Sequence, residues 1–327
     1  MKAAVFVSPD GSEPPREGNF ASPASPWDKG AWSPLAEARE SPVTHWRLRT
    51  QSIDLSRGAV LMGIINLTPD SFSDGGRLYR GGRLEVGAAL DDALRLAEEG
   101  AAILDLGAES TRPGSRPVDE SEELRRLLPA VAAICEASRV PVSVDTYRAA
   151  VAKEALDAGV EIINDVSAAT FDAAMASLLA ETGAGVCLMH KRGRPQTMQA
   201  DPRYDDVVAE VARWLADRRN ALVAAGVAAE RVTLDPGIGF GKTAAHNLRL
   251  IREAEALHAL GQPLLYGISR KRFLDVLTGI DHSRHPEQRL PGTLAVTLFL
   301  ASRGLRMFRV HDVAATKQAL DAFSPLT

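Results

Sequence analysis

The sequence predicts an α/β fold, a (β/α)8 TIM barrel that follows an irregular N-terminal extension. From residue 59 onward, short apolar runs alternate with amphipathic segments of helical length, eight of each kind. Such alternation predicts parallel strands connected by helices, and eight is the number of units that closes a barrel. A chain of 327 residues, 45% of them hydrophobic, can bury such a core. An open doubly wound sheet is the alternative, although it usually needs fewer strands.

Two regions differ in composition: we assign residues 1–50 to the irregular extension and residues 51–327 to the barrel. Residues 1–50 are rich in Pro, Ser, Gly and charge, and no helical or strand period persists in them. Three of the four tryptophans lie there and could pin part of the extension to the domain: Trp27, Trp32 and Trp46. Composition leaves open whether the extension is ordered. We expect residues 44–55 to form a short strand that caps the bottom of the barrel.

The predicted strands and helices then follow in order. Strands are expected at residues 60–65, 102–106, 142–144, 161–164, 185–189, 232–234, 264–266 and 307–310. Helices are expected at residues 85–99, 121–137, 148–158, 173–182, 204–225, 245–260, 291–302 and 313–323. Each strand is a mostly apolar run, and each helix repeats apolar residues at helical spacing.

The composition argues against several classes of partner. The formal net charge is −4, from 38 basic and 42 acidic residues, so neither a general nucleic-acid surface nor a membrane surface is indicated. The apolar stretch at residues 3–7 is too short for a signal peptide, and no run approaches membrane-spanning length. Cys135 and Cys187 have neither metal-ligand spacing nor a disulfide framework. We therefore expect a soluble, cytoplasmic protein that binds small molecules.

Residues 232–243, VTLDPGIGFGKT, combine a strand, a glycine-rich loop and the start of a helix. The alternating glycines allow the backbone to turn sharply and to approach a ligand closely. Two phosphate-binding motifs do not fit, because a Walker loop requires glycine at Pro236 and a dinucleotide fingerprint requires glycine at Lys242. What remains is Asp235, a carboxylate at the end of a strand, where it would face a ligand.

Polar residues gather where the predicted strands end, which is where barrel enzymes build their sites. Asp145, Asn164 and Asp235 offer oxygens that can accept N–H donors from a heterocycle with an amidine-like edge. The planar guanidinium of Arg309 can stack on such a ring. A second set suits a diphosphate, with Mg²⁺ held by Asn66 and by phosphate oxygens. Its members are Asn66, Arg112, Lys271, Arg309 and His311.

Two connections, at residues 68–82 and 111–119, are long for a compact barrel. Connections of this length are usually lids or binding loops rather than plain surface links. We therefore expect both of them to take part in the site.

Each candidate residue also has a plain structural interpretation. Asp145 could cap the helix that follows its strand, and Lys271 could be a solvated lysine in a first helical turn. Asp105 lies inside a predicted strand and is left unassigned, as a structural pair within the barrel. His311, and still more His190, could be an ordinary surface-loop histidine. The regular placement of so many polar strand ends nevertheless favours a ligand site.

Two longer runs carry a resemblance to a known family. Residues 63–76, GIINLTPDSFSDGG, and 107–115, GAESTRPGS, closely resemble the first two signatures of the dihydropteroate synthases. Further matches follow in the family's order: SVDT at 143–146, INDVS at 163–167, DPGIGFGK at 235–242, SRKR at 269–272 and RVHDV at 309–313. The matches span residues 58–325, and their combination is highly specific. Residues 1–50 match nothing in the family, and Ala108, Lys191 and Arg192 depart from its usual residues beside the motif positions.

The resemblance implies a transferase of folate biosynthesis that requires Mg²⁺. It would join 6-hydroxymethyl-7,8-dihydropterin diphosphate to 4-aminobenzoate and release 7,8-dihydropteroate and pyrophosphate. Residues of the family that hold the pterin match Asp145, Asn164, Asp235, Lys271 and Arg309. Those that bind the diphosphate and its metal match Asn66, Arg309 and His311. Those around the aminobenzoate match Phe72, Thr111, Arg112, Pro113, Phe240 and Ser269. The catalytic set would be Asn66, Arg112, Lys271, Arg309 and His311.

The resemblance further implies a sulfonamide target and a homodimer formed through helices near the C-terminus. Two rival functions stay open. A methyltransferase that passes a methyl group from methyltetrahydrofolate to a corrinoid protein would share the pterin residues but have no use for the long loops. A non-catalytic pterin-binding protein would be expected to lack loop or diphosphate residues, and these are present. No Ser-His or Cys-His arrangement indicates a protein nucleophile, so we expect pyrophosphate to depart before the amine attacks.

Overall fold

The computed structural model describes residues 43–68, 78–80, 83–110, 115, 118–193 and 196–326. Residues 1–42 of the predicted extension, with Trp27 and Trp32, lie outside this part. So do four predicted residues of the two long connections: Phe72, Thr111, Arg112 and Pro113.

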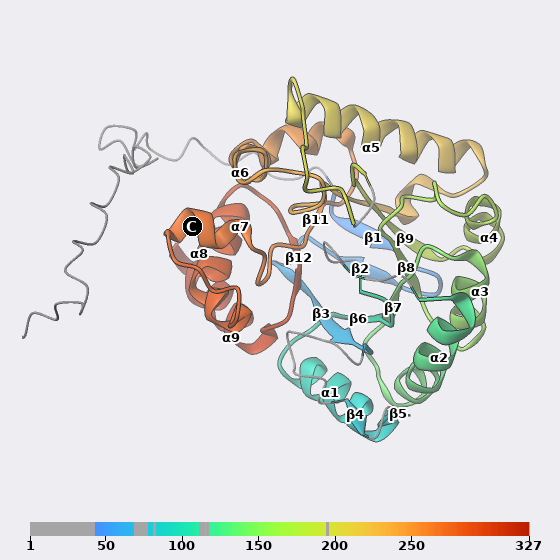
Figure 1. Cartoon of the computed structure of the whole chain (residues 1–327). Helices are drawn as coiled ribbons and strands as arrows, with labels where there is room; N and C mark the ends of the chain where they lie inside the picture. Colours follow the sequence, from blue (N-terminus) through green and yellow to red (C-terminus); the bar gives the residue numbers. More distant parts are fainter. Residues whose placement is uncertain are drawn as a thin grey trace, which may run out of the picture. The chain divides into compact units, whose positions relative to one another are not determined.

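Parallel strands form an eight-stranded sheet that curls into a barrel (Figure 1). They are β3 (Val60–Asn66), β6 (Ile103–Gly107), β7 (Val142–Asp145), β8 (Ile162–Asp165), β9 (Gly185–Met189), β10 (Val232–Asp235), β11 (Leu265–Tyr266) and β12 (Met307–Val310). Neighbouring strands follow the order β10-β9-β8-β7-β6-β3-β12-β11. A parallel bridge from Leu234 to Leu264 joins the two ends, and the N–H of Leu234 donates to the carbonyl of Pro263 at 2.9 Å. The predicted (β/α)8 barrel is confirmed, and the open sheet is excluded.

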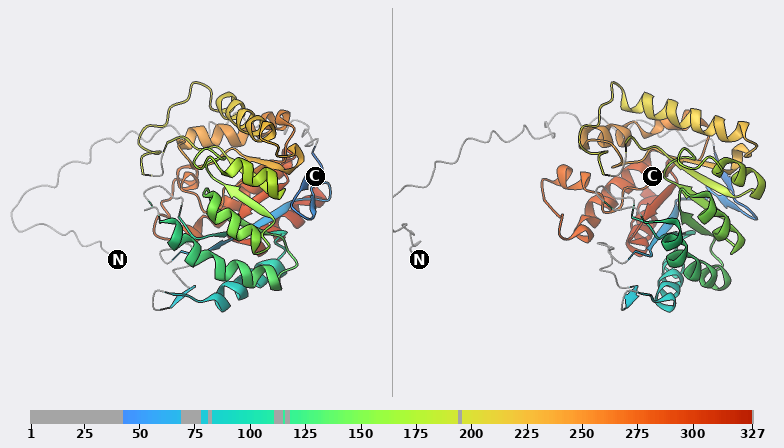
Figure 2. Two further views of the ribbon diagram at one scale, coloured as in Figure 1. Left: turned by 90° about the vertical axis from the view of Figure 1, so that its right-hand side faces the viewer. Right: turned by 45° about the vertical axis from the view of Figure 1, so that its right-hand side comes forward.

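Helices in the connections surround the strands (Figures 1 and 2). Those that match predicted segments are α1 (Val86–Glu98), α2 (Glu120–Ala137), α3 (Ala149–Asp157), α4 (Met175–Thr182), α5 (Val207–Ala224), α6 (Ala244–Arg252), α8 (Leu290–Ser302) and α9 (Val313–Phe323). The predicted helix at 245–260 is split, because α6 ends at Arg252 and the 3-10 helix η2 (Ala254–Leu260) follows. Within the described ranges, no helix is long and apolar enough to cross a membrane.

Several short elements are absent from the prediction. They are α7 (Phe273–Thr278), a hairpin of β4 (Tyr79–Arg80) and β5 (Arg83–Leu84), and the 3-10 helices η1 (Ala229–Arg231), η3 (Pro286–Arg289) and η4 (Ser324–Leu326). Elements this short contain too few residues to show a helical or strand period.

Alternation along the strands divides the core into two layers. On β3, Leu61 and Ile65 belong to the large cluster that the strands form with the helices. Val60 and Met62, which alternate with them, belong to a second cluster that contains residues from the first part of several strands, such as Ile103. This second cluster fills the end of the barrel at which the strands begin.

An N-terminal hairpin closes that end of the barrel. The sequence predicts one strand over residues 44–55, whereas the structure has two antiparallel strands, β1 (His45–Arg47) and β2 (Ser52–Asp54). Trp46 is fully buried in the second cluster, and its indole N–H donates to the carbonyl of Arg231 at 2.8 Å. Glu161 accepts hydrogen bonds from the N–H and the hydroxyl of Thr50, at 2.8 and 2.6 Å. The hairpin spans the predicted boundary between residues 50 and 51.

Candidate active site

The register of the sheet explains why the predicted site residues share one end of the barrel. Asn66 is opposite Gly107, Gly107 is opposite Asp145, and Asp145 is opposite Asn164. Because all these strands are parallel, their final side chains lie at the same mouth. The described members of the predicted set are Asn66, Asp145, Asn164, Asp235, Phe240, Ser269, Lys271, Arg309 and His311. The other four, Phe72, Thr111, Arg112 and Pro113, belong to the undescribed parts of the long connections.

Arg309 lies at the centre of this mouth, between two carboxylates. Its Nε donates to Asp105 Oδ2 at 2.6 Å, and its Nη2 donates to Asp145 Oδ2 at 3.2 Å. Asp105 is fully buried and also accepts from Ser143 Oγ at 2.7 Å and from Asn164 Nδ2 at 3.2 Å. Both bonds to Arg309 lie along the edge of the guanidinium, so its flat face can stack on a ring.

Asp105, which the sequence leaves unassigned, thus orients two residues of the predicted pterin site. It holds the amide of Asn164 with Nδ2 toward itself, so the amide oxygen remains to accept a hydrogen bond from a ligand. It also fixes the guanidinium of Arg309. The interpretation of Asp105 as a structural pair within the barrel is confirmed, and its partners are the site residues themselves.

Burial strongly affects the carboxylates of the mouth. It raises the pKa of Asp145 to about 7, with Arg309 opposing the shift and Asp105 reinforcing it. Burial also raises the pKa of Asp235, against the attraction of Lys271. Such carboxyl groups gain much from N–H donors of a ligand, because few water molecules compete for them.

The glycine loop after β10 fixes Asp235. Its Oδ1 accepts the N–H of Gly237 at 2.7 Å, and its carbonyl accepts the N–H of His190 at 2.9 Å. Gly237 has a φ of +67°, and a Cβ there would lie 1.8 Å from the carbonyl oxygen of His190. Glycine is therefore required at this point by both conformation and space.

Lys271 lies across this loop. Its Nζ donates to the carbonyl of Ile238 at 2.5 Å and lies 4.7 Å from the centre of the Phe240 ring. Burial lowers the pKa of Lys271 to about 8. A Cβ added at Gly267 would lie 3.6 Å from Lys271 Nζ and 3.9 Å from Asp235 Oδ2. Gly267 thus leaves space between a carboxylate and an ammonium group.

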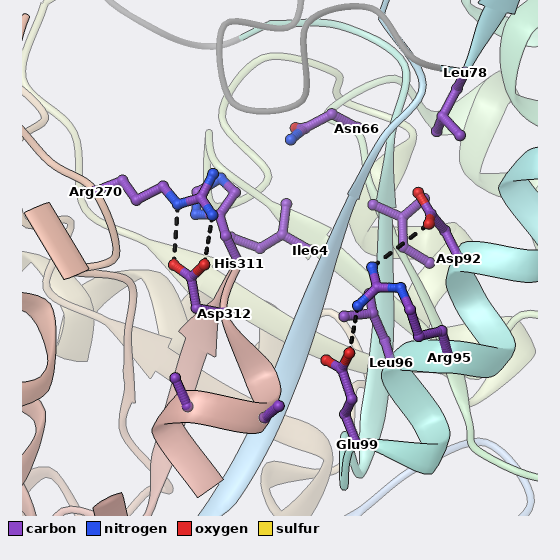
Figure 3. A pocket seen from close by; sticks show the side chains of 13 residues that line it. Ile64, Asn66, Leu78, Asp92, Arg95, Leu96, Glu99, Arg270, His311 and Asp312 are labelled. Carbon is purple, nitrogen blue, oxygen red and sulfur yellow. Dashed lines mark hydrogen bonds and ion pairs between the residues drawn. The ribbon is translucent and has the colours of Figure 1, made fainter. Parts of the chain in front are cut away.

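Ser269 and His311 meet on the other side of the mouth. The Nδ1 of His311 lies 3.0 Å from Ser269 Oγ, and the His311 N–H donates to the same oxygen at 3.2 Å. Arg270, which follows Ser269, has a φ of +58°, and its guanidinium forms two bonds to Asp312, at 3.0 and 2.5 Å (Figure 3). This ion pair joins the chain after β11 to the chain after β12.

A cavity of about 590 Å³ opens beside His311 (Figure 3). It lies between α1 and the start of α9, and its lining includes Asn66, Arg270 and His311 as well as Arg95. Asp145, Asn164 and Asp235 do not line it. The cavity therefore adjoins the predicted diphosphate end of the site rather than the predicted pterin end.

The possible metal ligands are few. In the described ranges, no group of three His, Cys, Asp or Glu side chains could hold a metal ion. Asn66, at the end of β3, carries an amide side chain and lines the cavity. Among the described residues, such a donor set suits an ion that takes most of its ligands from substrate and water.

The interpretation of His190 as a surface-loop histidine is wrong. His190 is 5% exposed, and its Nδ1 lies 2.8 Å from the Nζ of Lys242, which is 2% exposed. The sequence alone indicates no role for Lys242. The only available signal is its place at the end of the glycine loop, and a lysine near a chain turn is usually solvated.

Comparison with known proteins agrees with this geometry. The family model described as "Pterin binding enzyme" matches residues 62–311. The dihydropteroate synthase of Neisseria meningitidis serogroup C is 44% identical over 283 residues, which cover 86% of this chain and 97% of that protein.

Solved structures show the same relationship. The dihydropteroate synthase of Yersinia pestis, in a sulfonamide drug complex, has a TM-score of 0.80 and 40% identity, over 86% of this chain and 98% of that one. That of Xanthomonas albilineans, in complex with 7,8-dihydropteroate, has a TM-score of 0.75 and 40% identity, with the same coverage of 86% and 98%. The chain therefore belongs to the dihydropteroate synthase family of pterin-binding enzymes.

Proposed function

We propose that this protein catalyses the dihydropteroate synthase reaction. It joins 6-hydroxymethyl-7,8-dihydropterin diphosphate to 4-aminobenzoate and releases 7,8-dihydropteroate and pyrophosphate. The observation that carries the proposal is the polar group at the barrel mouth. Asp235 and Lys271 lie beside the space at Gly267, and Arg309 is bonded to Asp145 and, with Asn164, to Asp105. A pterin has adjacent N–H donors, ring acceptors and a flat face, so it can satisfy each member of this group.

Five residues would hold the pterin. The carboxylates of Asp145 and Asp235 would accept its N–H donors, together with the free amide oxygen of Asn164. Lys271 would donate to a ring acceptor with the protons that Ile238 does not use. The face of Arg309 would stack on the ring, since its edge is bound to Asp105 and Asp145.

The chemistry requires no protein nucleophile. The bond between the methylene carbon and the diphosphate oxygen breaks, and its electron pair leaves with pyrophosphate. The electron-rich pterin stabilises the methylene cation, while Arg309 and His311 stabilise the charge on the leaving group. The amine nitrogen of 4-aminobenzoate then donates its lone pair to the methylene carbon and loses one proton. Asn66, Arg112 and Lys271 complete the proposed catalytic set, as the family resemblance implies.

Mg²⁺ is part of the proposal through Asn66. A single protein amide is enough, because Mg²⁺ commonly keeps several waters and binds substrate phosphates. When bound, the ion would neutralise charge on the diphosphate. Asn66 borders the cavity beside His311, which supports this placement.

The aminobenzoate would lie near Phe240 and Ser269. Phe240 contacts Lys271, and Ser269 contacts His311, so both border the pterin and diphosphate residues. Phe72, Thr111, Arg112 and Pro113 enter this pocket on the family resemblance alone, since they lie outside the described residues.

We also infer a homodimer formed through α8. This helix buries Thr293, Thr297 and Leu300, whereas Leu294 remains partly exposed. Leu294 is not part of the core cluster with which Val296 and Phe299 pack, so a second copy packed on this side of the helix would explain an apolar residue there. A cytoplasmic location completes the proposal and suits the free thiols of Cys135 and Cys187.

The test is incorporation of labelled 4-aminobenzoate into dihydropteroate by the purified chain. We expect product only when pterin diphosphate, 4-aminobenzoate and Mg²⁺ are all present. Folded protein that binds a pterin analogue but forms no product would overturn the proposal. An assay of methyl transfer from methyltetrahydrofolate to a corrinoid protein would then distinguish the methyltransferase from a non-catalytic pterin-binding protein.

A further inference from the structure

Lys242, at the end of the glycine loop, is a buried ionisable side chain that the proposed chemistry does not use, and burial lowers its pKa to about 7. Its Nζ lies 2.8 Å from His190 Nδ1, 3.0 Å from the carbonyl oxygen of Gly237 and 3.1 Å from that of Phe240. A fourth acceptor, the carbonyl oxygen of His190, lies at 3.4 Å. An ammonium group has three donors, and the three nearest acceptors take all of them. Burying such a group is costly unless it is fully hydrogen-bonded, and these acceptors meet that requirement.

His190 is a fixed acceptor for this ammonium group. Burial and the charge of Lys242 lower the pKa of His190 to about 2, so the ring is neutral. With Nδ1 accepting from Lys242, its one proton is on Nε2. The ring centre lies 4.9 Å from that of Trp214, in an edge-on arrangement. Lys242 therefore bonds to a side chain that α5 holds in place.

The bonds of Lys242 cross a close contact between two backbones. A Cβ at Gly237 would lie 1.8 Å from the carbonyl oxygen of His190, and one at Gly241 would lie 2.3 Å from that of Arg192. The glycine loop thus rests directly on the segment after β9. Lys242 bonds to both sides, since Gly237 and Phe240 belong to the loop and His190 belongs to the facing segment.

The same loop presents three groups to the barrel mouth. Gly237 donates its N–H to Asp235, Ile238 offers its carbonyl to Lys271, and the ring of Phe240 lies under the Lys271 ammonium. Each of them lies within five residues of Lys242 in the chain. A change in the path of the loop would therefore move the proposed pterin and aminobenzoate contacts together.

We propose that Lys242 is a positioning residue of the synthase reaction, which fastens the glycine loop to His190 and so sets the places of Asp235, Lys271 and Phe240. This inference rests on the proposed function. The three N–H donors of Lys242 are taken up by protein acceptors, which leaves none for a substrate. Its effect is exerted through the loop.

The test compares Lys242→Met with wild type in the labelled aminobenzoate assay, at a temperature where both are folded. Small misplacements of substrate-positioning groups cost up to about 100-fold, so we expect kcat/KM to fall about 10- to 100-fold, with a higher KM for both substrates. The matched control is Glu161→Gln, which alters a buried charged side chain that is bonded to Thr50 at the other end of the barrel. The control should lower Tm and leave both KM values unchanged.

A double-mutant cycle with Phe240→Ala tests whether Lys242 acts through the loop. Residues that act as a unit are non-additive, so Phe240→Ala should cost much less in the Lys242→Met background than in wild type. If Lys242→Met lowers Tm but keeps wild-type constants, or if the two effects multiply, the proposal is overturned.

His190→Phe is the second variant, in case Lys242→Met does not fold. This substitution keeps a ring against Trp214 but removes one acceptor of Lys242. We expect kcat/KM to fall less than in Lys242→Met, again with a higher KM for both substrates. Unchanged constants would count against the proposal. Affinity for a pterin analogue, measured by calorimetry, gives the same comparison without turnover. Absence of product in wild type would refute the proposed function, whereas an unchanged analogue affinity in the variants would refute the role of Lys242.

Discussion

Asp235 shows what a single carboxylate contributes to the site. Asp235→Asn keeps an oxygen for the N–H of Gly237 but removes the negative charge that would face the pterin. A hydrogen bond to a charged group is worth about 1.5–3 kcal/mol, so affinity for a pterin analogue should fall about 10- to 100-fold, with little change in Tm. Calorimetry would measure it, with Asp157→Asn on α3, an exposed carboxylate, as control. Unchanged affinity would refute the assignment.

Asp145 should make pterin binding depend on pH. Its pKa is raised to about 7, so below that pH the carboxyl carries a proton and accepts N–H donors poorly. Binding must then release the proton, and affinity should be constant above the pKa and fall by about tenfold per pH unit below it. Asp235, whose pKa burial also raises, would steepen the fall.

The measurement is analogue affinity as a function of pH, with Asp145→Asn as the comparison. The variant should bind more weakly, and the part of the pH dependence that belongs to Asp145 should disappear. An identical profile in both proteins would show that another group, on the protein or the ligand, causes it.

The position of a site residue in the chain decides whether the sequence can predict it. Asp145, Asn164 and Asp235 directly end predicted strands, so the barrel alone places them at the mouth. Asp105 lies two residues before the end of β6, and its role depends on neighbours from β7, β8 and β12. Lys242 depends on a contact with the segment after β9. Contacts between distant segments of this kind leave no periodic signal.

At the scale of elements, α8 carries the prediction about assembly. Leu294 is partly exposed on a helix whose buried positions include Thr293 and Thr297. Leu294→Arg would place a charge at the centre of the proposed interface, where an unpaired buried charge is strongly unfavourable. Sedimentation should show a dimer for wild type and a monomer for the variant. The matched control is Val223→Arg on α5, an exposed apolar residue that should leave the dimer intact; a monomeric wild type would refute the inference.

Several predicted elements have the bounds that the structure shows, and other elements do not. The predicted strands at 185–189 and 307–310 have the same bounds as β9 and β12, and the helix at 313–323 has those of α9. Each is a run whose apolar period is uninterrupted. By contrast, the six-residue helix α7 is absent from the prediction, and β11 (Leu265–Tyr266) is one residue shorter than the predicted strand at 264–266. Packing against neighbours, rather than local pattern, decides such short pieces.

At the scale of the whole molecule, the closed barrel could be predicted because eight repeated units specify it. The N-terminal hairpin could be predicted only in part. The sequence predicts a strand over residues 44–55, but the turn inside it depends on distant partners: Thr50 bonds to Glu161, and Trp46 bonds to Arg231. The barrel end is therefore closed by contacts that the local sequence does not reveal.

Trp46 should contribute to stability and not to the site. Its side chain is fully buried among residues at the start of the strands, whereas the proposed pterin residues lie at the strand ends. Removing a large buried aromatic side chain costs about 3–5 kcal/mol, so Trp46→Ala should lower the free energy of unfolding by that order. Denaturant titration would measure the loss, and analogue affinity of the folded variant should match wild type. A loss of affinity without a loss of stability would contradict this prediction. The substitution would then act on the distant mouth of the barrel rather than on the cluster to which Trp46 belongs, and the two ends of the barrel would be coupled.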